Sequence, residues 1–323
     1  MKFSFLIFIF FAGASFLGIN QDEHLNLKPD TASKYTIVIH GGAGNISKDL
    51  PENEKQEYIN SLTEALNIGK EILQNGGSSL DAVEKVVRYL EDDPHFNAGK
   101  GAVFNSAGVH ELDASIMNGK DLSSGAVTLI RTVKNPISLA RLVMENTPYV
   151  LLGGEGAEEF AKQMNVEIVP NSYFDTPERV EQFKKLKEKS GTVGCVALDS
   201  YGNLAAATST GGLSNKMPGR IGDSPLINDG TYADNNTCAI SGTGIGELFI
   251  KNTVAFNISA LMKYKNYSLQ EAADEMINKR LKPGDGGIIA VDKEGNYVMT
   301  FNTIGMFRGA ANSEGVFEVK IWE

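Results

Sequence analysis

The stretch with the most potential chemistry runs from residue 191 to residue 246 and combines threonines with glycines. Three segments stand out in it: GTVG (191–194), TSTGG (208–212) and PGRIGDSP (218–225). A single threonine in such a place is most often a residue on the face of a strand. Here a strongly charged segment, 178–189, runs directly into the pair Gly191-Thr192. The combination suggests a mobile linker in front of a reactive residue.

The chemistry of Thr192 depends on whether it becomes N-terminal. A threonine hydroxyl is a poor nucleophile unless a base takes its proton. An α-amino group freed by cleavage before Thr192 has a pKa of roughly 7.7–8, which is far closer to neutrality than that of a lysine. One residue would then supply both the nucleophile and the base, and no histidine would be needed.

Several common catalytic motifs are absent from the sequence. It has no G-x-S-x-G serine elbow, no H-E-x-x-H zinc motif and no P-loop, since 99–101 (GKG) lacks a hydroxyl residue after its lysine. The four histidines are His24, His40, His95 and His110. A histidine-dependent triad would have to use one of the last three, which makes a self-contained threonine nucleophile more plausible.

A glycine-rich turn, 242–246 (GTGIG), follows an expected strand and opens an expected helix. Its spacing is G-x-G-x-G, whereas dinucleotide turns have G-x-G-x-x-G. The acidic residues that follow, Glu271 and Asp274, are poorly placed for a ribose contact. A backbone cradle for an anion or an oxyanion is therefore the more general interpretation.

Composition limits the class of protein. The 323 residues suit one large α/β domain or two small ones, and 42% hydrophobic with 22% charged residues is ordinary for a globular enzyme. A net charge of −10 without a basic stripe disfavours nucleic-acid binding. Cys195 and Cys238 are too few for a disulfide scaffold, so we expect two buried apolar residues.

The N-terminus resembles a secretory signal. Met1-Lys2 is followed by an apolar run, 3–11, and by the small residues Ala12-Gly13-Ala14. The run is short for a membrane span, so a cleaved signal at residues 1–19 is favoured over an uncleaved anchor. A loose polar leader follows it. A periplasmic or secreted location is therefore expected, in preference to a cytoplasmic one.

Hydrophobic periodicity predicts strands and helices in both halves of the chain. Strands are expected at 35–40, 126–133, 192–198, 204–209, 237–241, 287–291 and 297–302. Helices are expected at 54–74, from a cap at Ser78 to Pro94, and at 136–145, 156–164, 247–264 and 268–281. The stretch 96–118 is predicted to be rich in loops, and 178–189 to be a solvated helix or a linker. The pattern favours a layered α/β or α+β fold.

Five long segments resemble the plant-type L-asparaginase/isoaspartyl aminopeptidase family of N-terminal-nucleophile hydrolases. They are IVIHGGAG (37–44), LEDDPHFNAGKGAVFNSAGVHELDASIMNG (90–119), NPISLARLVMENTPYVLL (135–152), GTVGCVALDSYGNLAAATSTGGLSNKMPGRIGDSP (191–225) and SGTGIGELFI (241–250). The resemblance covers nearly everything after Lys34.

The resemblance implies an α+β fold, a four-layer αββα sandwich, made as one precursor. Autocleavage between Gly191 and Thr192 would give an α subunit, 20–191, and a β subunit, 192–323. The tail 165–191 is expected to be a flexible linker, and the two subunits to form one folded domain. Two αβ units would associate as an (αβ)2 homodimer, with no nucleic-acid partner and no membrane contact after signal removal.

The resemblance also assigns roles around the nucleophile. Thr192 matches the nucleophile, Thr210 the threonine that hydrogen-bonds it, and Asn97 the asparagine that positions it. Gly191 matches the residue before the cleaved bond, where the lack of a Cβ tolerates strain.

Four further residues match the part of the family's site that binds substrate. Arg220 would hold the substrate α-carboxylate, which suits its planar fork, and Asp223 would pair with the α-ammonium. Thr243 and Gly244 match the oxyanion-hole pair and would also bind substrate. Together they imply hydrolysis of β-aspartyl dipeptides and L-asparagine, releasing L-aspartate through a threonine acyl-enzyme.

No cofactor is expected for catalysis, but the loop 90–100 resembles the family's structural sodium site. Hard cations accept backbone oxygens as ligands. The main-chain carbonyls implied as ligands are those of Leu90, Glu91, Asp93, Phe96, Ala98 and Lys100.

Two alternatives remain at this point. Glycosylasparaginases share the fold and the threonine, but typically carry Asp before it, so Gly191 and the TSTGG segment favour the plant-type branch. Relative rates on β-Asp-Leu and GlcNAc-Asn would separate these two. The other alternative is a nucleotide-binding module built on the 242–246 turn, which NAD binding would reveal.

Overall fold

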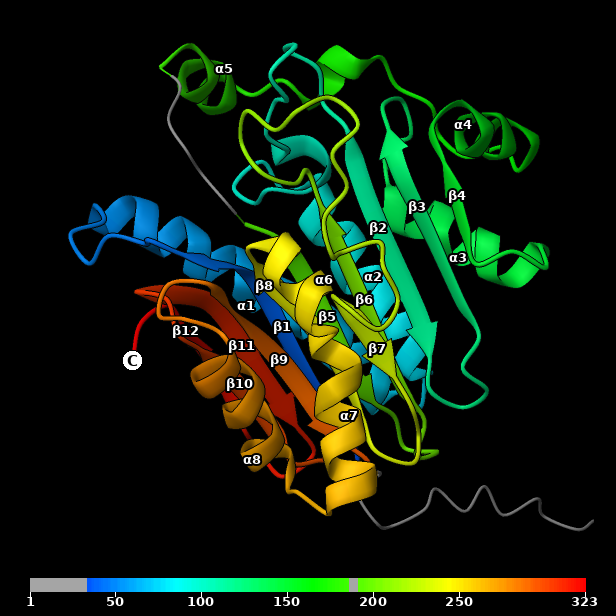
Figure 1. The fold of residues 1–323 in the computed structure, drawn as a ribbon, viewed down its shortest axis with the longest axis vertical. Helices are drawn as coiled ribbons and strands as arrows, with labels where there is room; N and C mark the ends of the chain where they lie inside the picture. Colours follow the sequence, from blue (N-terminus) through cyan, green and yellow to red (C-terminus); the bar gives the residue numbers. More distant parts are fainter. Residues whose placement is uncertain (1–33, 186–190) are drawn as a thin grey trace, which may run out of the picture. The chain divides into compact units, whose positions relative to one another are not determined.

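Two β-sheets organise the part of the chain that the structure, a computed structural model, describes: residues 34–185 and 191–323 (Figure 1). The larger sheet has the strand order β12-β11-β1-β5-β6-β2-β3-β4. Its strands are β1 (Thr36–Gly44), β2 (Leu112–Asn118), β3 (Ser124–Ile130), β4 (Leu151–Gly153), β5 (Val193–Leu198), β6 (Leu204–Thr210), β11 (Gly305–Asn312) and β12 (Phe317–Lys320). All neighbours are antiparallel except β3 and β4.

The smaller sheet has the order β10-β9-β8-β7 and is antiparallel. Its strands are β7 (Thr231–Ala233), β8 (Cys238–Gly244), β9 (Gly286–Asp292) and β10 (Tyr297–Phe301). Strands β8 and β9 contact β5 of the larger sheet, and β8 also contacts β6. The predicted signal, residues 1–19, lies outside the described residues, as do residues 186–190.

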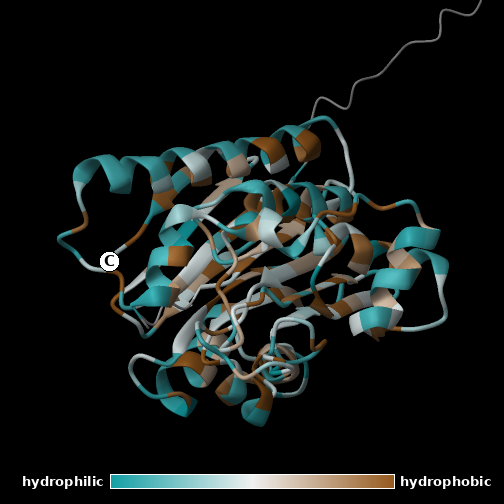
Figure 2. Cartoon of the chain, turned by 90° about the horizontal axis from the view of Figure 1, so that it is seen from above, coloured by the Kyte–Doolittle hydropathy of each residue, from teal (hydrophilic) through white to brown (hydrophobic). Residues whose placement is uncertain are grey.

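Helices cover both sheets. Contacts to the larger sheet come from α1 (Glu52–Gln74), α2 (Ser79–Asp92) and α3 (Pro136–Asn146). The smaller sheet is contacted by α7 (Val254–Lys265) and α8 (Leu269–Asp274). Two apolar cores result, one beneath α1 to α3 and one between the sheets and beneath α7 and α8. Figure 2 shows the mixture of hydrophilic and hydrophobic residues that such half-buried helices carry.

Helix α2 illustrates how the sequence sets these elements. The Ser78 side chain accepts a hydrogen bond from the Asp81 main chain and caps the helix. Val83, Val87 and Leu90 recur at helical spacing and are fully buried. The predicted helix is confirmed, and the mixed α/β class with it.

Some predicted elements differ from the structure. The helix expected at 247–264 is two helices, α6 (Gly246–Asn252) and α7, because Thr253 between them has a left-handed φ of 45°. The helix expected at 268–281 is α8 followed by a π-helical segment, η3 (Glu275–Arg280). The loop-rich stretch 96–118 contains η1 (Gly99–Gly101) and β2, and β11 and β12 follow the last predicted strand.

The expected linker region is structured where it is described. Residues 165–185 include η2 (Asn171–Phe174) and α5 (Pro177–Lys184), and they follow α4 (Gly154–Gln163). Phe174 and Arg179 are buried. The uncleaved chain therefore packs this region up to Lys185, and the flexible tail predicted for the cleaved protein stays a prediction.

The cysteines and the helices of the described residues bear on two other predictions. Cys195 and Cys238 are free and buried, as expected of small apolar residues. Among the helices of residues 34–185 and 191–323, none has the length and apolar composition needed to cross a membrane.

Candidate active site

Thr192 lies immediately before β5, a central strand of the larger sheet. Its neighbour Val193 pairs with Ser209 on β6, so the end of β6 lies beside Thr192. The Thr192 hydroxyl donates to Thr210 Oγ1 at 3.1 Å. Both threonines are buried, at 7% and 2% exposure. The structure thus brings together the two threonines that the sequence singled out.

The carbonyl of Gly191 lies between two donors. Asn97 Nδ2 donates to it at 2.8 Å, and Thr210 Oγ1 donates to it at 3.2 Å. Asn97 is itself fixed, because Nδ2 also donates to the carbonyl of Gly212 and Oδ1 accepts from Val103 N. Two donors at one carbonyl oxygen are the arrangement that stabilises developing negative charge there.

The end of β1 passes closely beside the same peptide bond. Gly42 has a φ of 111°, which favours glycine. A Cβ at Gly42 would lie 2.9 Å from Gly191 Cα and 3.3 Å from Thr192 N. A register shift between His40 and Gly42 in the β1–β11 pairing accompanies this approach. A side chain at position 42 would therefore disturb the bond before Thr192.

Arg220 is held by a carboxylate on one edge of its guanidinium. Nε and Nη2 donate to the two carboxylate oxygens of Glu247, at 2.8 and 2.9 Å. The remaining nitrogen, Nη1, would lie 3.4 Å from a Cβ at Gly212 and 2.7 Å from one at Gly222. Glycines at these positions let the planar group lie against the backbone. Sequence reasoning missed Glu247, although it falls in the segment 241–250, which resembles the family.

Asp223 is a buried carboxyl group with an unused oxygen. It is 5% exposed, and among the described residues its Oδ2 has no hydrogen-bond partner. Burial raises the pKa of Asp223 to about 7, and nearby Arg220 opposes the shift. A buried acceptor without a partner is rare in native proteins, and a ligand ammonium group would satisfy it.

These groups share one small cavity of about 10 Å³. It is lined by Gly191, Thr192, Thr210, Gly212, Leu213, Arg220, Gly222, Asp223, Ser224 and Gly244. A volume of this size suits about one water molecule. The nucleophile candidate, a cationic group and an unsatisfied carboxyl therefore meet in one place in the intact chain.

Thr243 and Gly244 end β8 next to this cavity. Gly244 lines it and has a φ of 152°, and a Cβ there would collide with the carbonyl of Asp285. Thr243 is 1% exposed, and its hydroxyl accepts from Ala43 N at 3.2 Å. Thr243 is thus not among the lining residues of the intact chain, in contrast to Gly244.

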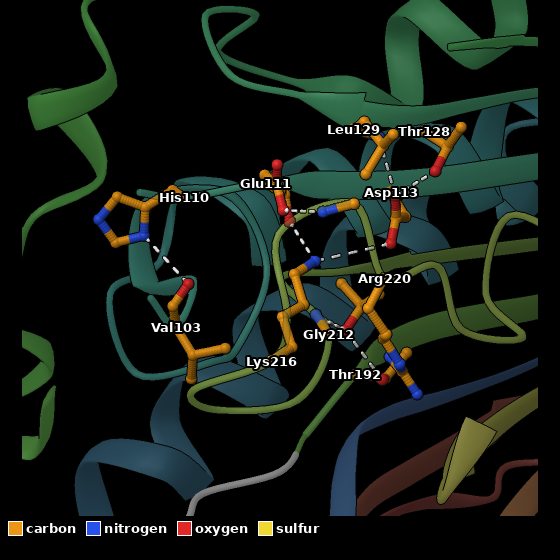
Figure 3. Close-up of polar contacts among 12 residues, drawn as sticks. Val103, His110, Glu111, Asp113, Thr128, Leu129, Thr192, Gly212, Lys216 and Arg220 are labelled. Atoms are coloured by element: carbon orange, nitrogen blue, oxygen red, sulfur yellow. Dashed lines mark hydrogen bonds and ion pairs between the residues drawn. The ribbon is translucent and has the colours of Figure 1, made fainter. Parts of the chain in front are cut away.

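The loop that holds Gly212 and Arg220 is bound to the start of β2 by hydrogen bonds and an ion pair (Figure 3). Lys216 Nζ donates to the carbonyl of Glu111 at 2.8 Å and lies 4.0 Å from Asp113 Oδ2. Gly219 N donates to Glu111 Oε2 at 3.0 Å. Sequence reasoning missed this cluster, whose signal is a pair of acidic residues, Glu111 and Asp113, where β2 begins.

The loop predicted to bind sodium runs from the end of α2 into η1. A Cβ at Gly99, whose φ is 50°, would collide with the carbonyl of Glu91, and one at Gly101 would collide with the carbonyl of Phe96. The carbonyls of Glu91 and Phe96, two of the implied ligands, therefore lie close against the glycines of this loop, and hard cations accept such oxygens as ligands. Within the described residues, no group of three or more His, Cys, Asp or Glu side chains could hold a metal ion. A sodium site built from main-chain carbonyls would not need such a group of side chains.

Comparison with known proteins gives the family. A family model described as asparaginase matches residues 33–190 and 181–321. The isoaspartyl peptidase of Salmonella typhimurium is 46% identical, over 85% of this chain and 95% of the relative. The isoaspartyl peptidase of Escherichia coli is 45% identical, over 89% and 97%. The human isoaspartyl peptidase/L-asparaginase is 45% identical, over 85% and 92%.

The chain is therefore a hydrolytic enzyme. More closely, it belongs to the asparaginase family, which confirms the resemblance predicted from the sequence.

Proposed function

We propose that this enzyme cleaves itself before Thr192 and then hydrolyses β-aspartyl dipeptides and L-asparagine, releasing L-aspartate. The observation that carries the proposal is the meeting of Thr192, Arg220 and Asp223 in one cavity. The Arg220 cation and the buried carboxyl group of Asp223, both beside the nucleophile, are complementary to the α-carboxylate and the α-ammonium group of an amino acid. The names of the relatives support the same two activities.

Autocleavage would begin with attack of Thr192 Oγ1 on the carbonyl carbon of Gly191. The oxyanion would form where Asn97 Nδ2 and Thr210 Oγ1 already donate. The C–N bond then breaks, the chain is linked through an ester to Thr192 Oγ1, and the departing nitrogen gains the proton that the hydroxyl loses. Water hydrolyses this ester and leaves Thr192 with a free α-amino group.

Substrate hydrolysis would reuse the same oxygen. The Thr192 amine takes the hydroxyl proton, and Oγ1 attacks the side-chain amide carbonyl of the substrate. Thr243 and Gly244 would stabilise the oxyanion, Arg220 would bind the α-carboxylate through its Nη1 side, and Asp223 would bind the α-ammonium. The amine or ammonia leaves with a proton, and water then resolves the ester to free L-aspartate.

The test is a denaturing gel with N-terminal sequencing and an assay on both substrates. We expect two fragments, the second beginning at Thr192, and release of L-aspartate from L-asparagine and from β-Asp-Leu. Thr192→Ala should remain one uncut chain without activity. A cut elsewhere, or full activity of the uncut chain, would overturn the proposal.

We also propose the finer architecture and assembly that the resemblance implies. The helix and sheet contacts described above support a four-layer αββα sandwich. The crowded carbonyls of the loop 90–100 support a structural sodium ion. An (αβ)2 assembly and a periplasmic or secreted location are proposed from the resemblance and from the N-terminal signal pattern, respectively.

A further inference from the structure

A row of buried polar side chains connects Thr192 to the space between the two sheets. His40 Nδ1 lies 2.9 Å from the carbonyl oxygen of Thr192, and His40 Nε2 lies 2.9 Å from Ser241 Oγ. The row continues from Ser241 to Thr208 at 2.7 Å and from Thr208 to Thr231 at 2.6 Å. All four side chains are fully buried.

The row ends at Ser115 on β2, which contacts both Thr231 and the main chain of Ser224. Ser115 Oγ lies 2.8 Å from Thr231 Oγ1 and donates to the carbonyl of Ser224 at 2.6 Å. Ser224 follows Asp223 directly in the chain. The row therefore takes one side chain from each of β1, β8, β6, β7 and β2, and runs from the main-chain carbonyl of Thr192 to that of Ser224, the residue after Asp223.

The donor and acceptor roles in both hydrogen bonds of His40 follow from the chemistry of its partners. A carbonyl oxygen only accepts, so His40 Nδ1 must carry a hydrogen and donate to Thr192. Burial lowers the pKa of His40 to about 3, so the ring is neutral and Nε2 is an acceptor. Ser241 must then donate to Nε2, which leaves its oxygen to accept from Thr208.

The same argument continues along the row. Thr208 uses its one hydrogen on Ser241, so it accepts from Thr231. Each hydroxyl thus has one defined donor role, and the whole row is satisfied with the single His40 tautomer that carries its hydrogen on Nδ1. Gly194 leaves room for this arrangement, because a Cβ there would collide with both Ser241 Oγ and His40 Nε2.

We propose that Ser241 and Thr208 are positioning residues that orient the nucleophile through His40. The Ser241 hydroxyl, itself held by Thr208, donates to Nε2 and so keeps the imidazole in the orientation in which Nδ1 donates to the Thr192 carbonyl. Thr192 lies just before Val193, the first residue of β5 that pairs with β6, so strand pairing does not fix Thr192 itself. The hydrogen bond from His40 to the Thr192 carbonyl fixes it instead. With the hydroxyl held by Thr210 as well, the place of the α-nitrogen relative to Oγ1 is set.

This inference rests on the proposed role of Thr192 as nucleophile. The experiment uses full-length, self-cleaved protein and compares Ser241→Ala with Ser259→Ala. Ser259 is a matched control, because it is 1% exposed and shares a 2.7 Å hydroxyl bond with Thr237 without touching the row. We expect Ser241→Ala to lower kcat roughly 10-fold with KM unchanged, as for one lost buried hydrogen bond. Ser259→Ala should keep both values.

A second measurement separates positioning from a general packing effect. Nitrogen NMR of the histidines should show the Nδ1–H tautomer of His40 in the native protein and in Ser259→Ala, and a changed ring signal in Ser241→Ala. If Ser241→Ala does not fold, Thr208→Val against Thr208→Ser tests the same point, since only serine retains the hydroxyl. A folded variant that no longer cleaves itself also supports the inference, because cleavage uses the same oxygen.

Equal kcat in Ser241→Ala and Ser259→Ala, or in Thr208→Val and Thr208→Ser, would overturn the inference. The proposed function would survive that result, provided that the native chain is cut before Thr192 and Thr192→Ala is inert. If the native chain is not cut there, the proposed function itself fails. The two failures are therefore distinguishable.

Discussion

At the scale of single residues, the site combines groups whose properties depend on burial. Asp223 has an unused oxygen and a pKa raised to about 7, whereas the pKa of His40 is lowered to about 3. In both cases burial disfavours the charged form. Asp223 is thus an acceptor that a bound cation would satisfy, and His40 is a neutral hydrogen-bonding group over the working range of pH.

The raised pKa of Asp223 predicts a pH dependence of substrate recognition. An ionised carboxylate should bind the substrate α-ammonium, and ionisation occurs as pH rises through about 7. The ratio of kcat/KM for L-asparagine to that for succinamic acid, which lacks the α-amino group, should therefore rise from about pH 6 to about pH 8. The comparison cancels the titration of the Thr192 amine, and a flat ratio would contradict the assignment.

The pH dependence of the stability of the folded protein is an independent test of the raised pKa of Asp223. Its folded-state pKa lies above the ordinary value of 3.8, so the stability that its protonated form contributes is lost as pH rises from about 4 to about 7. Asp223→Asn should unfold at a higher temperature than the native protein at about pH 8 and at a similar one at about pH 4. The same variant should lose the rise in the substrate ratio.

At the scale of elements, the loop between β6 and Arg220 depends on a charge pair inside the protein. The side chains of Lys216 and Asp113 are 1% and 0% exposed. Burial lowers the pKa of Lys216 and raises that of Asp113, and each charge opposes the shift of the other. Removing one partner therefore leaves the other as an uncompensated buried charge.

Lys216→Met should be destabilised by roughly 3–5 kcal/mol, because it strands the carboxylate of Asp113. The double variant Lys216→Met/Asp113→Asn should recover much of this loss, since no buried charge remains. KM should rise in the single variant, because the loop also carries Arg220. Thermal unfolding and kinetics of the three proteins measure these effects, and a double variant less stable than the single one would contradict the pairing.

The elements also show where sequence reasoning succeeded. Helix α2 and the hairpins β5–β6 and β9–β10 were predictable, because apolar periodicity and turn residues are local signals. The break at Thr253 was not, because a left-handed threonine has no local signature. Nor were Lys216 and Glu247 found, since their partners Asp113 and Arg220 lie 103 and 27 residues away along the chain, respectively, and only the fold brings each pair together.

At the scale of the molecule, the predicted cleavage would not separate the sheet. In the larger sheet, β5 lies between β1 and β6, and β6 pairs with β2. Strand β1, from before Gly191, therefore lies between β11 and β5, both from after it, and β6 from after it pairs with β2 from before it. Two chains joined by such pairing remain associated after the peptide bond is cut.

This arrangement predicts that cleavage and activity rise together while the size of the native particle stays constant. Samples taken during incubation should show the two fragments increasing on a denaturing gel in proportion to the release of L-aspartate. Size-exclusion chromatography of the same samples should give one unchanged peak, whose mass also tests the (αβ)2 assembly. Activity that precedes the cut, or fragments that elute separately, would contradict this prediction.

The two donors at the Gly191 carbonyl have a consequence for quality control of folding. Asn97 and Thr210 can act on that carbonyl only when distant parts of the chain have assembled correctly. Under the proposed mechanism, a copy whose sheets are misassembled cannot complete the first reaction on its own backbone. The proposed cleavage would thus act as a check on correct folding, and every active enzyme molecule would already have catalysed the cleavage of one bond, its own.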